Sequence, residues 1–154
     1  MPERSTTDEH GTVLVVADDV NAAELLARLV AGGGFRAVVA QSPEAAMIDI
    51  EDADAPFAAV LLDLELRHGT SSLRALADIR RLPGTAGHVP VVVCSWDDDT
   101  RSQAWMTGVD GYLVRPFAAA DLQALITEAV ERPEHHREDH RKRQLGLPGV
   151  KPPR

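Results

Sequence analysis

Three aspartates stand directly after apolar runs of the chain, and they are the residues best placed to do chemistry. Asp18 and Asp19 follow the run Val13 to Ala17, and Asp63 follows the run Val60 to Leu62. Both runs are typical of buried parallel strands, which read as continuous apolar segments. Because ligands in such sheets bind beyond the carboxyl ends of the strands, we expect the three carboxylates to meet at one edge of one sheet.

Carboxylates gathered at one point repel each other and raise each other's pKa unless a cation lies between them. The cation that suits such an all-oxygen site is a hard ion such as Mg²⁺. The alternative is that these acids solvate strand ends and cap helices, with Asp19 as the cap of the first helix. The order and spacing of the strands favour the metal site.

Composition indicates one domain with an aliphatic core. The 154 residues are 44% apolar but only 4% aromatic, which is enough for one domain plus tails. No stretch is long enough to cross a bilayer, and the N-terminus lacks an apolar signal segment. The single cysteine, Cys94, cannot form an internal disulfide and is interpreted as a small core residue. We therefore expect a cytoplasmic protein.

Charge is distributed unevenly along the chain. Residues 132–154 carry a net charge of +4, and the remaining residues carry −12, which together give the overall −8. The acidic body argues against direct binding of nucleic acid by the domain. For the basic tail we favour a solvated segment, while contact with nucleic acid, with an acidic partner or with the domain's own acidic edge stays open.

Strand and helix patterns alternate five times along the chain. This alternation predicts a parallel sheet with helices on both faces. The predicted strands are Val13–Ala17, Ala37–Ala40, Ala59–Leu62, Val91–Cys94 and Tyr112–Val114. The predicted helices are Asn21–Ala31, a segment capped by Ser42 that runs to about Glu51, Ser72–Leu82, Thr100–Thr107 and Ala119–Glu131.

The two ends of the chain lack this alternation. Residues 1–11 are interpreted as a flexible leader. Residues 133–154 form a charged tail for which we leave two alternatives open, disorder or a polar helix from Glu134 to Leu145. The tail is too short to make a DNA-binding output domain.

Four features follow one another at the ends of the predicted strands. Asp18-Asp19 follows the first strand, Asp63 the third, Ser95 the fourth and Arg115-Pro116-Phe117 the fifth. This ordered set resembles the receiver domain of two-component response regulators over about residues 12–131, and we place the domain at 12–132. The resemblance implies a flavodoxin-like α/β fold, a (βα)5 three-layer sandwich with strand order 2-1-3-4-5. Helices one and five would cover one face and helices two, three and four the other.

The resemblance also implies roles for individual residues. Asp63 matches the aspartate that accepts a phosphoryl group. Asp19 matches a direct Mg²⁺ ligand, Asp18 matches the acid that holds the ion through water, and the backbone carbonyl of Glu65 would supply a further ligand.

Further matches concern the response to the phosphoryl group. Ser95 matches the hydroxyl that hydrogen-bonds it, and Tyr112 matches the aromatic residue that moves inward with that hydroxyl. Arg115 stands where the family has its basic residue, and the peptide bond to Pro116 is cis in the family. Residues arranged in this way would respond to the added charge of the phosphoryl group, as other phosphorylation switches do.

The chain departs from the family pattern at several points. Arg115 replaces a lysine, and a planar fork is not equivalent to a point charge. Trp96 stands where a small residue usually leaves a path to the acceptor, so we expect it to modulate access to Asp63. The segment from Ser95 to Arg115 is shorter than usual, and Asp97-Asp98-Asp99 adds acids that either cap a helix or repel a phosphoryl group.

The histidines are interpreted as solvated. For His68 we favour a surface loop over a catalytic role. The set His135, His136 and His140 has spacings that suggest a metal site, but a solvated face within a mixed-charge tail is the preferred interpretation.

We therefore expect a stand-alone receiver that is phosphorylated at Asp63 with Mg²⁺ and is not otherwise an enzyme. Its partners would be a sensor histidine kinase or phosphotransfer protein and a downstream protein target. It would signal, or form a homodimer, through the face made by the fourth helix, fifth strand and fifth helix. The alternative is a degenerate receiver that acts as an interaction or dimerisation module without phosphorylation. A small hydrolase or nucleotide-binding protein is disfavoured because no Gly-rich loop follows the first strand.

Overall fold

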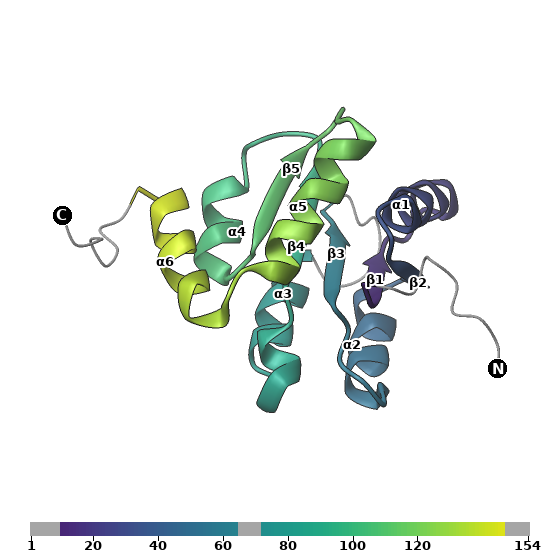
Figure 1. Ribbon diagram of the computed structural model, residues 1–154, viewed down its shortest axis with the longest axis horizontal. Helices are drawn as coiled ribbons and strands as arrows, with labels where there is room; N and C mark the ends of the chain where they lie inside the picture. Colours follow the sequence, from purple (N-terminus) through teal and green to yellow (C-terminus); the bar gives the residue numbers. More distant parts are fainter. Residues whose placement is uncertain (1–9, 65–71, 147–154) are drawn as a thin grey trace.

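The computed structural model describes residues 10–64 and 72–146, and it contains one parallel sheet (Figure 1). The strand order is β2-β1-β3-β4-β5, as predicted. The strands are β1 (Thr12–Val16), β2 (Arg36–Ala40), β3 (Ala59–Asp63), β4 (Val91–Ser95) and β5 (Gly111–Val114). The three central strands β1, β3 and β4 are buried almost throughout, which is why their sequences read as unbroken apolar runs.

Helices connect the strands and follow the last one. They are α1 (Val20–Gly32), α2 (Pro43–Asp52), α3 (Ser72–Arg80), the short 3₁₀ helix η2 (Gly84–His88), α4 (Arg101–Thr107), α5 (Ala119–Glu131) and α6 (Glu134–Gln144). Within the described part of the chain, no helix is long and apolar enough to span a membrane.

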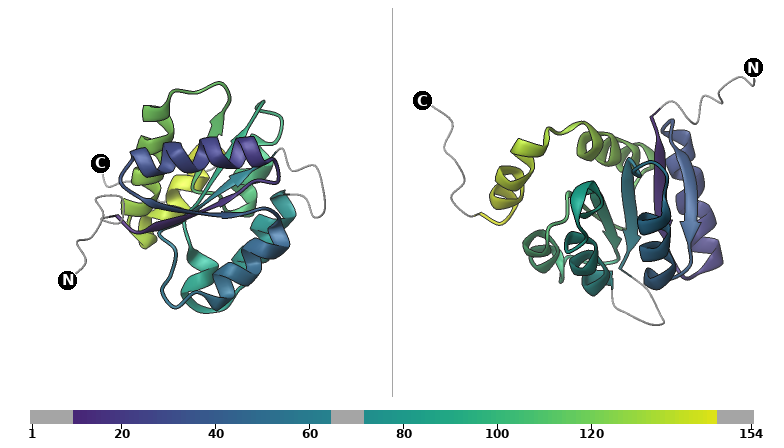
Figure 2. Two further views of the ribbon diagram at one scale, coloured as in Figure 1. Left: turned by 90° about the vertical axis from the view of Figure 1, so that its right-hand side faces the viewer. Right: turned by 90° about the horizontal axis from the view of Figure 1, so that it is seen from below.

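The sheet lies between two helical layers, each with its own half of the core (Figure 2). On one face, α1 and α5 bury their apolar stripes against the odd-numbered positions of β1, where Val13 and Val15 lie. On the other face, α2, α3 and α4 pack against Leu14 and Val16. The predicted distribution of helices over the two faces is therefore confirmed, and it follows from the period-two alternation of side chains along a strand.

Local capping explains where the first two helices begin. The Asp19 carboxylate accepts a hydrogen bond from the Ala22 backbone N–H at 3.0 Å and caps α1. The Ser42 hydroxyl accepts from the Ala45 N–H at 3.0 Å, and Pro43 occupies the first turn of α2. Both caps satisfy backbone donors that would otherwise lack a partner. The cap at Asp19 is the one that the alternative to the metal site described.

The register of the strands brings the predicted site residues to one edge. Val16 lies opposite Leu62, and Asp63 lies opposite Cys94. Ser95 lies opposite Val114, so the residue that follows Val114 leaves the sheet beside Ser95. Residues far apart in the sequence therefore emerge together at the carboxyl edge of the sheet.

Of the two alternatives left open for the tail, the structure has the polar helix. This helix, α6, contacts α4 and lies at the end of the molecule farthest from α1 (Figure 1). Arg137 in α6 is buried, with 8% of its surface exposed, although the sequence favoured a solvated segment. The difference arises because α6 is held by polar contacts, which leave no apolar stripe in the sequence.

Candidate functional site

Asp63, the acceptor predicted from the sequence, lies at the carboxyl edge of the sheet. Asp63 is the last residue of β3 and is 5% exposed, and Ser95 is the last residue of β4 and is 3% exposed. Asp18 and Asp19 directly follow β1, the other neighbour of β3 in the sheet. The backbone thus brings all four residues to the carboxyl edge, where ligands of open α/β sheets bind.

The Arg115 side chain, which follows β5, contacts Asp63. Its two terminal nitrogens donate to the two carboxylate oxygens of Asp63, each at 3.2 Å. The Arg115 backbone N–H donates to the carbonyl of Ser95 at 2.7 Å, which fixes the start of the loop. The next peptide bond, Arg115–Pro116, is cis, as the resemblance implies. A forked contact of this kind recognises planar anions and neutralises the Asp63 charge.

The fit of a divalent cation was tested on the donors. Asp18, Asp19 and Asp63 offer oxygen ligands, which is the chemistry that Mg²⁺ prefers. Within residues 10–64 and 72–146, however, no three histidine, cysteine or carboxylate side chains lie together in an arrangement that could hold a metal ion. Asp19 points one oxygen at the start of α1, and Asp63 faces Arg115. Glu65 lies outside the described residues, so the metal site stays a prediction with a suitable donor chemistry.

A hydroxyl network connects Ser95 to the start of α4. The Asp97 N–H donates to the Ser95 hydroxyl at 3.4 Å, which is a long contact. The Tyr112 hydroxyl donates to the Asp97 carbonyl at 2.8 Å and lies 3.0 Å from the Thr100 hydroxyl. Tyr112 is buried, and the guanidinium of Arg101 lies over its ring at 4.7 Å. Ser95 and Tyr112, the two residues expected to act as a switch, therefore both bond to the backbone of Asp97.

A cavity of about 320 Å³ lies beside this network. Its lining includes the apolar residues Leu64 and Leu73 and the hydroxyl-bearing residues Ser72, Ser95 and Thr100. The Ser72 hydroxyl donates to the Asp63 carbonyl at 2.6 Å, which joins the start of α3 to the end of β3. Space of this kind next to Ser95 leaves room for the hydroxyl network to rearrange.

Trp96 does not enclose the acceptor in a buried pocket. Its side chain is one of the most exposed apolar ones among the described residues, at 61%. The guanidinium of Arg115 lies 5.5 Å from the centre of the indole ring, which is a cation–π distance. Trp96 therefore contacts the same cation that neutralises Asp63, and its effect on access stays a prediction.

An apolar groove of about 410 Å³ continues from Trp96 and Arg115 across α1. Its walls include Leu25, Leu29 and Phe117, and Leu25 is 57% exposed. Leu25 and Trp96, which is 61% exposed, therefore present an apolar surface to solvent along this groove. Cys94, by contrast, is buried, and burial raises the pKa of its thiol to about 12, so it stays a neutral core residue.

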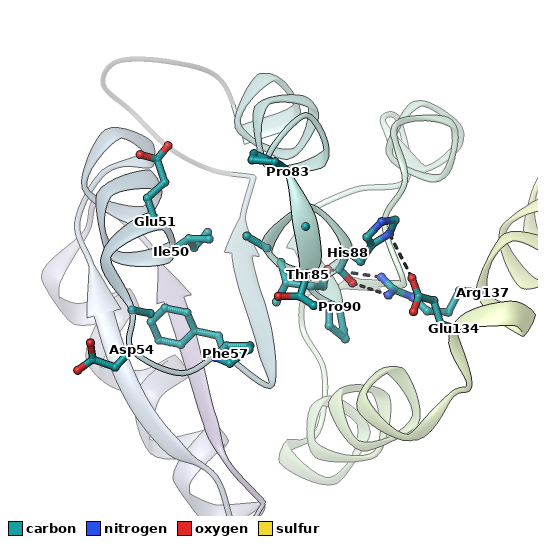
Figure 3. Close-up of a pocket in the computed structure, with 15 residues that line it drawn as sticks. Ile50, Glu51, Asp54, Phe57, Pro83, Thr85, His88, Pro90, Glu134 and Arg137 are labelled. Atoms are coloured by element: carbon teal, nitrogen blue, oxygen red, sulfur yellow. Dashed lines mark hydrogen bonds and ion pairs between the residues drawn. The ribbon is translucent and has the colours of Figure 1, made fainter.

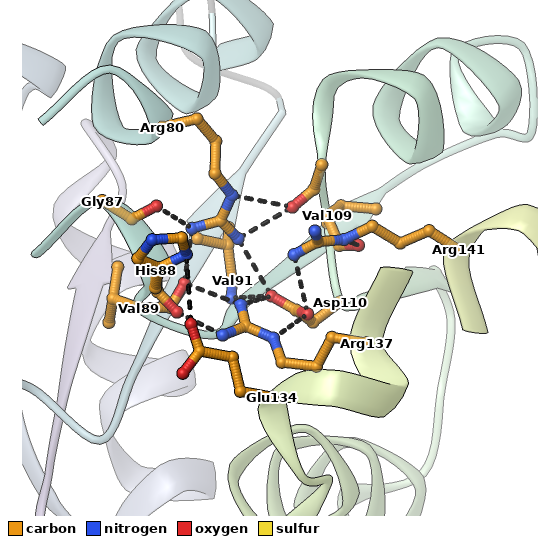
Figure 4. Close-up of polar contacts among 11 residues, drawn as sticks. Arg80, Gly87, His88, Val89, Val91, Val109, Asp110, Glu134, Arg137 and Arg141 are labelled. Carbon is orange, nitrogen blue, oxygen red and sulfur yellow. Dashed lines mark hydrogen bonds and ion pairs between the residues drawn. The ribbon is translucent and has the colours of Figure 1, made fainter. Parts of the chain in front are cut away.

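The structure contains a second polar centre that the sequence patterns did not indicate. It is built around Asp110, 2% exposed, which directly precedes β5 at the amino edge of the sheet, opposite to Asp63. Three arginines from α3 and α6 surround it (Figure 4). A weak signal was present, because Arg137 and Arg141 are four residues apart and share a helix face. Nothing in the sequence identified their partner.

A larger cavity, of about 790 Å³, also lies at this amino edge (Figure 3). It lies between α2, η2 and the start of α6, with Phe57 and Pro90 in its walls. Its polar groups include the pair formed by His88 and Glu134, whose side chains are 3.4 Å apart. This cavity holds none of the predicted site residues, and we do not assign it chemistry.

The histidines show no metal centre in the part of the chain that is described. The rings of His135 and His136 lie 4.2 Å apart and both side chains are exposed, whereas His140 turns toward α4 and contacts Trp105. Burial and the neighbouring Arg132 and Arg143 lower the pKa of His140. His68 lies outside the described residues.

Comparisons with known proteins agree with the geometry. The family model of the response regulator receiver domain matches residues 13–127. The transcriptional regulatory protein ZraR of Escherichia coli is 25% identical over 126 residues, which are 80% of this chain but only 27% of that protein. The chain thus spans about a quarter of the length of this relative.

Solved structures give the same fold. A putative response regulator from Chloroflexus aurantiacus is 25% identical, with a TM-score of 0.72, and the match covers 80% of this chain and 100% of that one. The receiver domain of a sensor histidine kinase from Pseudomonas aeruginosa, whose structure holds a magnesium ion in the active-site cleft, has a TM-score of 0.70 at 20% identity. That match covers 79% of this chain and 98% of the other.

Proposed function

We propose that this chain, which belongs to the response regulator receiver domain family, accepts a phosphoryl group on Asp63 and transmits its presence by protein–protein contact. The observation that carries the proposal is the pairing of Asp63 with Arg115. A buried carboxylate at the end of β3 faces a cation from the loop after β5, beside the hydroxyl of Ser95. A nucleophile, a charge-neutralising group and a hydrogen-bond donor therefore meet at one edge of the sheet.

The chemistry would be a transfer between two phosphoryl carriers. An oxygen of Asp63 attacks phosphorus and forms an O–P bond, while the bond to the donor's histidine nitrogen breaks and its electron pair returns to the imidazole. A carboxylate that approaches a charged phosphoryl group is repelled unless cations offset the charge. When bound, Mg²⁺ would supply this neutralisation, with Asp18, Asp19 and Asp63 as the residues that hold it.

Arg115 has two tasks in this scheme. In the structure it occupies both oxygens of Asp63, so it must release at least one before the carboxylate can attack. After transfer, its fork fits the phosphoryl oxygens. The Ser95 hydroxyl then donates to the phosphoryl group, and Tyr112 follows the loop that Ser95 and Asp97 share. The chain would catalyse its own phosphorylation and dephosphorylation but no other reaction.

Partners are proposed from the surfaces around the site. The groove lined by Leu25, Trp96 and Phe117 adjoins Arg115 and suits the apolar side chains of a sensor histidine kinase or phosphotransfer protein. The face made by α4, β5 and α5 would bind the downstream protein or a second copy of this chain. This proposal concerns the receiver alone, since the chain spans about a quarter of ZraR.

Intact-mass measurement with acetyl phosphate and Mg²⁺ tests the proposal. We expect a gain of one phosphoryl group in the natural chain and none in Asp63→Asn. Asp78→Asn serves as a matched control, because Asp78 is paired with Arg81 on the surface, and it should label like the natural chain. Failure to label under conditions that phosphorylate an ordinary receiver would contradict the proposal.

A further inference from the structure

The attachment of α6 to the domain is unusual in being almost entirely polar. Its sequence, EHHREDHRKRQ, contains no aliphatic residue, so it has no apolar stripe to bury. An isolated helix of 11 residues is marginal in water, and tertiary contacts must stabilise it. Its bound state therefore depends on a small number of identifiable contacts.

Asp110 supplies the centre of those contacts (Figure 4). Arg137 donates to both Asp110 oxygens at 2.9 Å, and Arg141 donates to one at 3.0 Å. Arg80, from α3, donates to Asp110 at 2.9 Å. The Val91 N–H at the start of β4 completes the set at 2.9 Å. Carboxylate and guanidinium groups that are buried together hold firmly only when their hydrogen bonds are satisfied in this way.

The same arginines also hold backbone carbonyls next to Asp110. Arg141 donates to the Val109 carbonyl at 2.9 Å, and Arg137 donates to the His88 carbonyl. Arg80 donates twice to the carbonyl of Gly108, at 3.0 and 2.7 Å, and Gly108 is the left-handed residue that ends α4. The cluster therefore fixes the C-terminal end of α4 as well as α6.

A direct contact joins α6 to α4. The ring of His140 meets the ring of Trp105 edge-on, with centroids 5.5 Å apart. Trp105 is 4% exposed, and its indole nitrogen has no hydrogen-bond partner among the described residues. A buried donor without a partner is costly, so burial of Trp105 beneath α6 is less favourable than burial of an apolar side chain of equal area.

The N-terminal end of α4 is held by a different group. The Tyr112 hydroxyl contacts the carbonyl of Asp97 and the hydroxyl of Thr100, the residue that precedes α4. Because α4 has only seven residues, both of its ends lie within about 10 Å of each other along the axis. A short helix that is held at both ends moves as one body, so displacement at one end is felt at the other.

We infer that α6 is an intramolecular restraint on α4, and that its docking is coupled to the Tyr112–Thr100 contact at the opposite end of that helix. Loss of the Tyr112 contact frees α4 to shift and weakens the hold of α6. Coupling of this kind is reciprocal, so release of α6 favours the shifted loop by the same free energy. The inference deepens the proposed function, under which phosphorylation of Asp63 would be the signal that moves the loop.

Hydrogen exchange of the α6 amides in Tyr112→Phe tests this coupling without phosphorylation. We expect deuterium uptake in residues 134–144 to rise about threefold to tenfold, which corresponds to the loss of one or two hydrogen bonds of about 0.5–1.5 kcal/mol net each. Ser42→Ala is the matched control, since it removes a helix-cap hydroxyl on α2 and destabilises the domain without touching α4. Equal uptake in the two variants at equal unfolding free energy would overturn the inference.

The reverse direction is tested with a pair of arginines on α6. Arg141→Gln removes a donor to Asp110, whereas Arg143→Gln changes an exposed residue two positions away. We expect Arg141→Gln to be labelled faster by acetyl phosphate and Arg143→Gln to be labelled like the natural chain. Equal labelling rates would contradict the coupling. A chain that takes no phosphoryl group at all would refute the proposed function, and the exchange experiment would still decide the inference.

Discussion

Two aspartates lie at opposite edges of the same sheet and both face arginine, yet they are held very differently. Asp63 at the carboxyl edge is paired with the guanidinium of Arg115 through two contacts of 3.2 Å. Asp110 at the amino edge has three guanidinium partners and a backbone N–H, all at 2.9–3.0 Å. The contacts between Asp63 and Arg115 lie at the long end of the hydrogen-bond range, whereas those of Asp110 lie at its centre.

The arginines around Asp110 each bond to several groups at once. Arg80 and Arg137 also donate to backbone carbonyls, so any movement would leave several buried groups without a partner. The Arg115 side chain is about as buried as that of Arg80, with 13% and 16% exposed, so burial alone does not distinguish the two edges. Asp110 thus joins α3, β4 and α6 through short contacts, whereas the pairing of Asp63 with Arg115 is made by longer ones.

The largest effect on stability is expected from a substitution of Asp110. In Asp110→Asn, the charge that three buried arginines share is removed, and we expect the free energy of unfolding to fall by about 3–5 kcal/mol. Asp78→Asn removes an exposed ion pair with Arg81 and should change it by less than about 0.5 kcal/mol. Urea denaturation of both variants measures these values. A loss at Asp110 as small as at Asp78 would show that the cluster does not anchor the fold.

The dependence of stability on acid pH tests whether the Asp110 carboxylate is charged in the folded protein. Burial opposes ionisation of Asp110, but the hydrogen bonds from Arg137 and the charges of Arg141, Arg137 and Arg80 outweigh it and lower its pKa below the ordinary 3.8. Its contribution is therefore complete above that ordinary value and is lost as pH falls toward the lower, folded-state pKa. Urea unfolding between about pH 5 and about pH 3 should show a steeper fall in the natural chain than in Asp110→Asn. Parallel curves would refute the charged state of Asp110.

At the carboxyl edge, Arg115→Lys tests how the forked contact with Asp63 affects the rate of phosphorylation. Lysine keeps the charge but replaces a fork on two oxygens by a single point contact. Freeing one hydrogen bond worth about 1 kcal/mol should raise the initial rate of acetyl phosphate labelling about fivefold. Arg81→Lys, on the surface, should leave the rate unchanged. Slower labelling in Arg115→Lys would mean that the fork assists attack rather than restraining it.

Trp96→Ala should have the smallest effect. Its contact with the Arg115 guanidinium is an exposed cation–π pair worth about 0.5 kcal/mol, so its loss should raise the labelling rate roughly twofold. Ile48→Ala, which truncates a 60% exposed side chain on α2, provides the comparison. A large increase in the Trp96 variant alone would show that the indole blocks entry of the phosphoryl donor.

Sequence patterns predicted that the aspartates meet at the carboxyl edge, because each strand that leads to this edge is recognisable from a few neighbouring residues. The apolar runs before Asp18 and Asp63 specify buried strands, and strand ends of a parallel sheet must meet. The side-chain contacts at that edge did not follow from the pattern. Arg115 donates to both oxygens of Asp63, and Asp19 accepts the capping hydrogen bond of α1. Both contacts depend on side-chain rotamers that are selected only in the folded structure.

By itself the sequence determined the parallel sheet with helices on both faces and the position of Asp63 at a strand end, because periodicity acts over a few residues. The order of the strands and the assignment of helices to each face followed from the resemblance to the receiver family. Only the tertiary structure decided that α6 docks on α4. Asp110 and Arg137 are 27 residues apart, and a helix held by guanidinium groups carries no apolar repeat that would reveal its partner. A buried charge finds its partners through folded geometry, and no local pattern records which ones they are.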